Sequence, residues 1–555
     1  MCGIAGFISK NKEYNSKQIV SEMLNSMSYR GPDQSGIKVY GDVTLGMARL
    51  SIVDKKIHNI PYEDKDKNYS IIYNGEIYNH DSIRDSLKLK YEFKTNSDAE
   101  TALYNYIEKG IYSFVEYNGM YVFAIYDNIK KTTCIVRDKT GEKPLYYAKG
   151  KDYFAFASEM KCLLKIVKPE FNEQAISYDA YEFTVGAETL FKNIYSLEPG
   201  EYLEVHDDAN YIKHEYWKLW DNLIEIEDDE KKIIKQLSEL VEDSILLRTK
   251  NCVHGFGCFV SGGLDSALIA SIAKPDYIYT VHYDYDDFNE LEYAKLLAKK
   301  MKKELIVVIP NKEDFLRTRE KIAFHLDTPC TWTSFSLWML LGRAKKDVRV
   351  VMIGDGADEI FSGYHRYLLL YHDEQIKKLE TMSKYSYLIN KYYGSPIERY
   401  LKLINRYENQ FDNKVNTYLE NSIRYFFDKV NGDIVHSMGL NDFYTTMQVL
   451  LQMSDRLCMA FSIENRSPFL DYRLVQFGFS MPSKYKIRDG IPKWALKEVA
   501  KKFIPMEIVQ RIDKRGFSAP VNRWFEWDKN GKYNRNTYKN IVFDDWRKVF
   551  RVNNV

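Results

Sequence analysis

From residue 232 onward the sequence alternates between helical patterns and short apolar strand patterns, and this order constrains the fold more than any other feature. A predicted helix at 232–248 is followed by an apolar strand at 257–260, a Ser/Gly-rich turn and a second helix from about Ala267. Strands that alternate with helices favour a doubly wound parallel α/β sheet with helices on both faces. Residues 360–530 have mostly helical patterns and would add helices to that sheet.

The first 200 or so residues differ, because they contain many short strand patterns. Helical patterns interrupt them at 17–27 and 98–108. The strand patterns are β-branched or aromatic, are bounded by turn residues and lie at 43–48, 69–73, 120–126, 133–136 and 189–205. This half is therefore predicted to be a layered α/β domain with much antiparallel pairing.

A strongly charged segment at 221–232 separates the two halves. It is either a linker or the solvated first turn of the next helix, and both interpretations place a boundary near 215–230. We predict one domain over 1–215, a second over 230–530 and a polar, loosely attached C-terminal tail over 531–555.

Charge and cysteine content exclude several classes of partner. Lys plus Arg number 79 and Asp plus Glu number 78, so the net charge of +1 gives no reason to expect nucleic acid or an anionic membrane. The sequence has no apolar run of about 18 residues, so no membrane span is expected, and its start lacks the basic region of a secretory signal. The 7 scattered cysteines show no zinc-ligand spacing and favour a cytoplasmic location.

Cys2 follows the initiator methionine, and removal of Met1 would leave Cys2 with a free α-amine. Such an amine has a pKa of about 8 and can act as general base for its own thiol. The alternative is a small buried cysteine without a chemical role.

Five blocks, separated along the chain, support a chemical role for Cys2. They are Cys2-Gly3-Ile4-Ala5-Gly6, Tyr29-Arg30-Gly31-Pro32-Asp33, Arg49-Leu50-Ser51-Ile52-Val53, Tyr73-Asn74-Gly75-Glu76-Ile77-Tyr78-Asn79 and Ser97-Asp98-Ala99-Glu100-Thr101. In this order they resemble the class II glutamine amidotransferase domain, over roughly residues 1–200. The resemblance implies an Ntn-hydrolase-like layered α/β/β/α fold and a thiol that attacks the side-chain amide of glutamine.

The resemblance also assigns roles in glutamine hydrolysis. The Asn74 amide and the Gly75 N–H would stabilise the oxyanion, and Arg49 would bind the glutamine carboxylate. Glu76 and Asp98 would receive the ammonium end or hold the substrate backbone. Taken singly, Asn74-Gly75 is a hairpin turn signal, Arg49 a surface ion pair and Asp98 a helix N-cap. The implied glutamine-binding set is Arg49, Ile52, Val53, Asn74, Glu76 and Asp98.

A second chemical segment, Val260-Ser261-Gly262-Gly263-Leu264-Asp265-Ser266, follows a predicted strand and opens a predicted helix. Exposed N–H groups and small hydroxyls at a helix N-terminus suit phosphate oxygens. The segment lacks the lysine of a Walker A loop and resembles the PP-loop of ATP pyrophosphatases, which cleave ATP between the α and β phosphates. Taken alone, it is an ordinary loop.

An acidic turn, Gly354-Asp355-Gly356-Ala357-Asp358-Glu359, follows the apolar strand pattern at 348–353. The carboxyl ends of parallel strands are where ligands bind in such sheets. With this turn, the segments 455–471, 493–497 and 514–517 resemble the glutamine-hydrolysing asparagine synthetase family, and the likeness covers about residues 1–520.

This resemblance implies ATP as a substrate and Mg²⁺ as a cofactor held by Asp265 and Asp358. Lys493 would neutralise phosphate charge during adenylation, and Asp355 would take part in catalysis at a position where the family often has Glu. Ser467 and His282 also depart from the family pattern. The implied ATP site consists of Val260, Ser261, Gly262, Gly263, Asp265, Ser266, Val281, Gly354 and Asp355.

The implied reaction converts ATP, aspartate, glutamine and water to asparagine, AMP, diphosphate and glutamate through an acyl-adenylate. Another carboxylate acceptor, such as a sugar uronate or a peptide acid, stays open because of Asp355. A non-catalytic scaffold is disfavoured since Cys2, Asn74, Asp265 and Asp358 are all present, and the intact loop disfavours a glutaminase without ligase activity. We expect small-molecule partners, an internal ammonia channel and, from the family alone, a homodimer.

Overall fold

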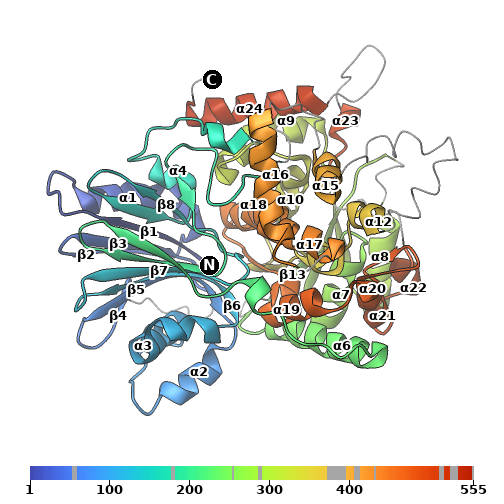
Figure 1. Cartoon of the computed structure of the whole chain (residues 1–555), viewed down its shortest axis with the longest axis horizontal. Helices are drawn as coiled ribbons and strands as arrows, with labels where there is room; N and C mark the ends of the chain where they lie inside the picture. Colours follow the sequence, from blue (N-terminus) through green and yellow to red (C-terminus); the bar gives the residue numbers. More distant parts are fainter. Residues whose placement is uncertain are drawn as a thin grey trace.

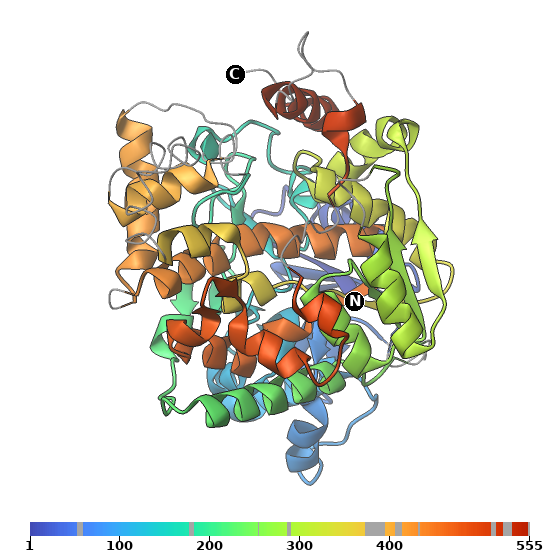
Figure 2. The ribbon, with the colours of Figure 1, turned by 90° about the vertical axis from the view of Figure 1, so that its right-hand side faces the viewer.

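The computed structural model of the chain describes residues 1–52, 59–176, 182–252, 255–285, 290–371, 395–405, 413–430, 433–511, 518–524 and 535–552. Figure 1 shows two parts, a strand-rich N-terminal part in blue and cyan and a helix-rich part in green to red. In Figure 2 the C-terminal helices face the viewer and the N-terminal strands lie behind them.

The N-terminal part is a sandwich of two six-stranded antiparallel sheets, with strand orders β10-β8-β9-β1-β3-β2 and β12-β11-β7-β6-β5-β4. The strands are β1 (Cys2–Ile8), β2 (Gln34–Tyr40), β3 (Val43–Arg49), β4 (Tyr62–Glu63), β5 (Tyr69–Ile77), β6 (Gly119–Asp127), β7 (Thr132–Arg137), β8 (Tyr146–Lys149), β9 (Phe154–Ala157), β10 (Tyr195–Ser196), β11 (Glu201–His206) and β12 (Tyr211–Glu215).

Helices cover both outer faces of this sandwich. They are α1 (Ser16–Ser26) and α4 (Met160–Leu163) on the first sheet, and α2 (His80–Leu87) and α3 (Asp98–Lys109) on the second. Side chains alternate along β1, so that Ile4 and Ile8 enter the core between the sheets while Ala5 and Phe7 pack with α1. The predicted α/β/β/α layering is therefore confirmed.

The C-terminal part is built on a five-stranded parallel sheet of order β15-β14-β13-β16-β17. Its strands are β13 (Gly257–Phe259), β14 (Tyr277–Val281), β15 (Leu305–Val308), β16 (Val350–Met352) and β17 (Glu464–Arg466). The helices next to the sheet are α6 (Glu230–Leu247), α7 (Leu264–Ala273), α8 (Leu291–Met301), α9 (Lys312–Leu326), α10 (Trp332–Ala344) and α18 (Thr446–Ala460).

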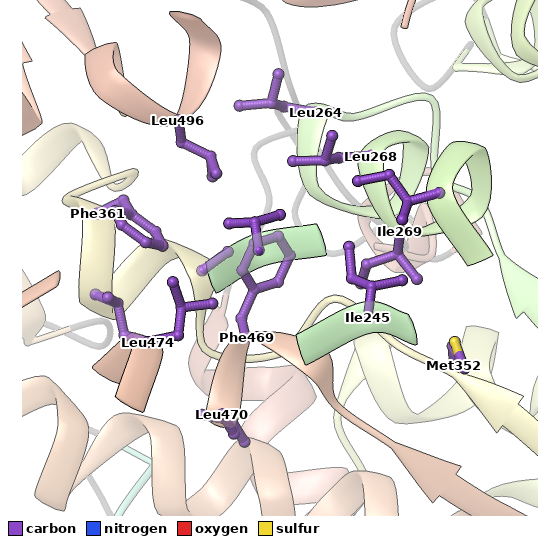
Figure 3. Close-up of a cluster of buried hydrophobic side chains, with 14 of the residues drawn as sticks. Ile245, Leu264, Leu268, Ile269, Met352, Phe361, Phe469, Leu470, Leu474 and Leu496 are labelled. Carbon is purple, nitrogen blue, oxygen red and sulfur yellow. The ribbon is translucent and has the colours of Figure 1, made fainter. Parts of the chain in front are cut away.

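Alternating side chains place apolar cores on both faces of this sheet. Cys258 and Met352 pack with α6, α7 and α8, whereas Phe259 and Val351 pack with α9, α10 and α18. The predicted doubly wound sheet is confirmed. Figure 3 shows part of the first core, where Leu264 and Leu268 of α7 lie in one cluster with Leu474 and Leu496 from two later helices.

Further helices begin within and after the acidic turn, and the helical patterns at 360–530 predicted those in that range but not the last one. They are α11 (Ala357–Phe361), α12 (His365–Tyr371), α15 (Pro396–Ile404), α16 (Asn413–Phe427), α17 (Ile434–Tyr444), α19 (Tyr472–Ser480), α20 (Ser483–Lys486), α21 (Trp494–Ala500), α22 (Met506–Val509), α23 (Val521–Trp524) and α24 (Arg535–Phe550), with two short strands, β18 (Ile487–Arg488) and β19 (Ile491–Pro492).

The predicted loose tail is instead anchored by α24. Phe543, Trp546 and Phe550 recur at helical spacing and pack with Phe191 of the N-terminal part, while α24 also lies along α9. The indole Nε1 of Trp546 donates to the backbone oxygen of Asp327 at 2.9 Å. These aromatic residues on one face of α24 attach the tail to both parts of the chain. The polar composition of the tail did not indicate this attachment.

The charged segment at 221–232 is a connection up to Asp229 and the first turn of α6 from Glu230 onward, so each of the two interpretations holds for part of it. Asp229 caps α6 by accepting a hydrogen bond from the N–H of Lys232. The domain limits 1–215 and 230–530 stay predictions. Within the residues that the structure describes, no helix combines the length and the apolar character that a membrane crossing requires.

Candidate active sites

Cys2 opens β1 beside Arg49 at the end of β3, and both side chains are buried. The Cys2 N–H donates to Oδ1 of Asn74 at 2.8 Å. Burial raises the pKa of the Cys2 thiol, while the nearby Met1 amine and Arg49 oppose this rise. In the chain that still carries Met1, the Met1 ammonium pairs with Oε2 of Glu464 at 3.1 Å.

Asn74 and Gly75 lie inside β5, opposite Val122 and Tyr121 of β6, so the hairpin-turn interpretation is wrong. Asn74 Nδ2 is buried and lacks a hydrogen-bond partner among the described residues. A Cβ at Gly75 would lie 2.2 Å from the Met120 oxygen, so only glycine fits there. A free amide donor therefore lies next to Cys2.

A cavity of about 40 Å³ is lined by four of the predicted glutamine-binding residues, namely Arg49, Ile52, Glu76 and Asp98, but not by Asn74. The predicted catalytic residues Cys2 and Gly75 line it as well. Asp98 is the first residue of α3 rather than its cap, because Ser97 supplies the capping oxygen. Its Oδ2 accepts hydrogen bonds from the Tyr73 hydroxyl and the Ile77 N–H, which fixes the carboxylate toward β5. Val53 lies outside the described residues.

The cavity also contains residues that sequence reasoning missed. Tyr62, Tyr73 and Ser97 come from the N-terminal part, and Glu464 comes from β17 of the parallel sheet. Tyr73 and Ser97 are the first residues of two recognised blocks, so those blocks could have indicated them. Glu464 belongs to the recognised segment 455–471, but nothing in that segment indicates a glutamine site, because Glu464 is 462 positions away from Cys2 in the chain.

The predicted phosphate loop joins β13 to α7. The Ser266 hydroxyl accepts from the Ser261 N–H at 3.2 Å, and the Ser261 hydroxyl accepts from the Gly263 N–H at 3.4 Å. Gly263 caps α7 without a side-chain bond, so the helix N-terminus is open to a ligand. The loop borders a cavity of about 580 Å³ at the carboxyl edge of the sheet.

Lys493 connects the two predicted metal ligands. Its Nζ lies 2.7 Å from Oδ1 of Asp265 and 2.5 Å from Oδ1 of Asp358. Lys493 has a left-handed backbone, which costs about 1 kcal/mol for a non-glycine residue. A Cβ at Gly363 would lie 1.9 Å from Asp358 Oδ1, so glycine there leaves room for this group. Two carboxylates beside one cation suit Mg²⁺ bound jointly with phosphates.

Asp355, Glu359 and Tyr364 line the same cavity. Burial raises the pKa of Asp355 to about 6, and a hydrogen bond of 2.7 Å from the Ser454 hydroxyl opposes this rise. Burial and then Asp358 raise the pKa of Glu359 to about 7, and the Tyr364 hydroxyl donates to Glu359 at 2.5 Å. Both carboxyls can therefore exchange protons near neutral pH.

The predicted ATP set is only partly brought together. The cavity lining includes Ser261, Gly263, Asp265, Ser266, Gly354, Asp355 and Lys493 but not Val260, Gly262 or Val281. Val281 lies in the apolar core on the α9 and α10 face. The lining adds residues that sequence reasoning missed, among them Thr333, His365, Leu368, Leu450, Lys497 and Arg511. The segment 514–517 lies outside the described residues.

An Ntn-type sandwich with a cysteine at position 2, joined to a parallel sheet with a phosphate loop, defines a glutamine amidotransferase fused to an ATP-dependent synthetase. Residues 1–217 match the family model described as "Glutamine amidotransferase domain", and residues 236–541 match that described as "Asparagine synthase". The chain belongs to the asparagine synthase family, whose type of chemistry is glutamine-dependent amidation that uses ATP.

Similar proteins extend over most of the chain. "Asparagine synthetase [glutamine-hydrolyzing] 1" of Bacillus subtilis is 29% identical, over 96% of this chain and 89% of that protein. A putative asparagine synthetase of Mycobacterium bovis is 27% identical, over 94% and 88%. A second putative enzyme, from Methanocaldococcus jannaschii, is 31% identical, over 68% of this chain and 78% of its own length.

Proposed function

We propose that this chain transfers the amide nitrogen of glutamine to the β-carboxylate of aspartate, with cleavage of ATP to AMP and diphosphate. The observation that carries the proposal is the grouping of Asp265, Asp358 and Lys493 beside the Ser261–Ser266 loop in one large cavity. The relatives named asparagine synthetase support aspartate as the acceptor.

In the first half-reaction the Cys2 thiol attacks the side-chain carbonyl of glutamine. The unpartnered Nδ2 of Asn74 and the Gly75 N–H would stabilise the oxyanion that forms. Ammonia leaves, and water hydrolyses the resulting thioester to glutamate. Removal of Met1 would give Cys2 the α-amine that accepts the thiol proton.

In the second half-reaction the acceptor carboxylate attacks the α-phosphorus of ATP, and diphosphate leaves. Ammonia then attacks the acyl carbon of the adenylate, AMP leaves, and the new amide nitrogen loses a proton. Lys493 would offset the charge that builds on phosphate oxygens. Asp355 would accept this proton, since its pKa of about 6 lies close to neutral pH.

Mg²⁺ belongs to this proposal as the cofactor that Asp265 and Asp358 would hold. When bound, it supplies Lewis-acid neutralisation of the pyrophosphate oxygens. The Asp265 carboxylate already faces the ammonium of Lys493, so this corner of the cavity accommodates positive charge.

Diphosphate release tests the acceptor. The protein is incubated with ATP, Mg²⁺ and glutamine, with and without aspartate, and diphosphate and asparagine are measured. We expect aspartate-dependent release with equal amounts of the two products. Release that requires a different carboxylate, such as a uronate or a peptide acid, would replace aspartate but keep the chemistry. Glutamine hydrolysis without diphosphate release under any acceptor would reject the ligase.

A further inference from the structure

The segment between α6 and β13 reaches from the synthetase part to the glutamine site. Asn251 Nδ2 donates to Oε1 of Glu76 at 3.0 Å. Glu76 is 2% exposed and lines the cavity beside Cys2, whereas Asn251 lies behind Glu76 and outside the lining. The bond therefore acts on the substrate site through Glu76.

The backbone holds Asn251 in the orientation that this bond requires. Asn251 has a φ of 61°, the left-handed region that asparagine tolerates better than most residues. The preceding residues are pinned by Arg466, whose Nη1 donates to the backbone oxygens of Arg248 at 2.8 Å and Lys250 at 2.5 Å. Arg466 is itself fixed by Glu464, Nε to Oε1, at 2.7 Å.

The charges around Glu76 make this donor consequential. The groups that face Glu76 are Tyr73 of β5, Asp98 of α3, Cys252 of the same segment, and Glu464 and Arg466 of β17. Burial and Asp98 raise the pKa of Glu76, and Arg466 and Asn251 oppose the rise. A neutral N–H donor favours the ionised carboxylate without adding a charge that would compete for an ammonium group.

We propose that Asn251 is a positioning residue of the glutamine site, supplied by the synthetase part, which holds Glu76 in place to receive the substrate ammonium. The inference rests on the proposed function, because it assumes that Glu76 binds glutamine. Glu76 Oε2 makes no hydrogen bond or ion pair with the described residues and is left for the ligand. The complete glutamine site therefore includes both parts of the chain.

The test compares Asn251→Gly and Asn251→Asp with the unmodified protein. Glycine removes the donor but keeps the left-handed backbone, and aspartate keeps the shape but turns an acceptor toward Glu76. Thr249→Ala is the matched control, since Thr249 lies in the same segment as Asn251 and, among the residues that the structure describes, its hydroxyl bonds only the Leu246 oxygen of α6. KM and kcat for glutamine hydrolysis are measured from about pH 6 to about pH 9. Diphosphate release with ammonium as the nitrogen source reports on the synthetase site.

For Asn251→Gly we expect the KM for glutamine to rise about tenfold, as for loss of a hydrogen bond to a charged group, with ammonium-supported synthesis retained. The KM for glutamine should rise as pH falls, because Glu76 becomes protonated. Since loss of the donor raises the pKa of Glu76, this rise should begin at a higher pH in Asn251→Gly than in the unmodified protein. The difference in KM between the two proteins should therefore narrow as pH increases. Asn251→Asp should show a larger shift in the same direction. In a Glu76→Ala background, where neither the carboxylate nor an acceptor oxygen remains, Asn251→Gly should have no further effect.

An unchanged KM and pH profile in Asn251→Gly would overturn the inference. So would a parallel loss of both activities, which would mark Asn251 as a purely structural residue. If the unmodified protein hydrolyses no glutamine, the proposed function itself fails, so the two failures are distinguishable.

Discussion

Nη1 of Arg30 lies 2.8 Å from Oδ2 of Asp455, and both side chains are completely buried between the two parts of the chain. Nε of Arg30 also donates to the backbone oxygen of Cys2 at 3.0 Å. Ser454, the neighbour of Asp455 on α18, donates to Asp355. One ion pair thus links the backbone of the proposed nucleophile to the helix that contacts the proposed catalytic carboxylate.

Arg30→Met should lower the stability by about 3 kcal/mol, because it removes the buried cation that Asp455 and Glu159 share. The loss is partial, since Asp455 keeps Lys143, and Glu159 keeps Arg456 and Lys161. Adding Asp455→Asn should recover part of the loss. Thermal unfolding midpoints measure both effects, with Arg317→Met as an exposed control. We also expect Arg30→Met to release more than one glutamate per diphosphate. If the stability losses of Arg30→Met and Asp455→Asn simply add and the ratio of glutamate to diphosphate is unchanged, the proposed link through this ion pair is contradicted.

Cys2→Ala should abolish glutamine-dependent amidation, a loss of at least about 10³-fold, because it removes the thiol of the proposed nucleophile. Synthesis from added ammonium salts should persist, since the second site does not use the thiol. Diphosphate release with each nitrogen source measures this, and Cys134→Ala serves as a buried-cysteine control on β7. Loss of both activities in a folded Cys2→Ala protein would contradict the division of labour.

Lys493→Met should reduce ATP-dependent synthesis by about 10²–10³-fold, since Asp265 and Asp358 would face each other and the phosphates without a fixed cation. Glutamine hydrolysis should continue, which shows that the protein is folded. Lys501→Met is the control, because Lys501 pairs with Glu498 on the surface. Equal synthesis rates in Lys493→Met and Lys501→Met would remove Lys493 from the mechanism.

The titration of Asp355 should appear in the pH dependence of stability. Its pKa is about 6 in the folded protein and 3.8 ordinarily, so the stability linked to its protonation is complete below about 3.8 and is lost as pH rises through 6. Asp355→Asn should therefore be more stable than the unmodified protein by about 1–3 kcal/mol at pH 8, and nearly equal to it at pH 4.

Unfolding midpoints at several pH values test this difference. Asp347→Asn is a control at a carboxylate that bonds Tyr279 and Arg343 outside the cavity. A difference between Asp355→Asn and the unmodified protein that does not vary with pH would contradict a raised pKa. Ammonium-supported synthesis by the unmodified protein should also decline below about pH 6, where Asp355 can no longer accept a proton.

Much of the architecture follows from local sequence. The helices α1 and α3 and the alternation of strands and helices after residue 232 are where side-chain periodicity predicts them. The exceptions have physical causes. β17 has the sequence Glu464-Asn465-Arg466, which shows no apolar pattern. This strand can nevertheless be buried, because Glu464 pairs with Arg466 and with the Met1 amine. Asn74-Gly75 resembles a turn but continues a strand paired with β6.

The residues of the two candidate sites were recognisable as motifs, since each block carries its own chemistry within a few positions. Their mutual arrangement was not, because sequence contains no distance between segments far apart in the chain. Only packing of the sandwich against the parallel sheet brings Asn251 to Glu76, and only the helices after β16 bring Lys493 to Asp265. The sequence by itself determined which groups are present, and the tertiary structure decided which of them meet, because burial and pairing of charges depend on neighbours from distant segments.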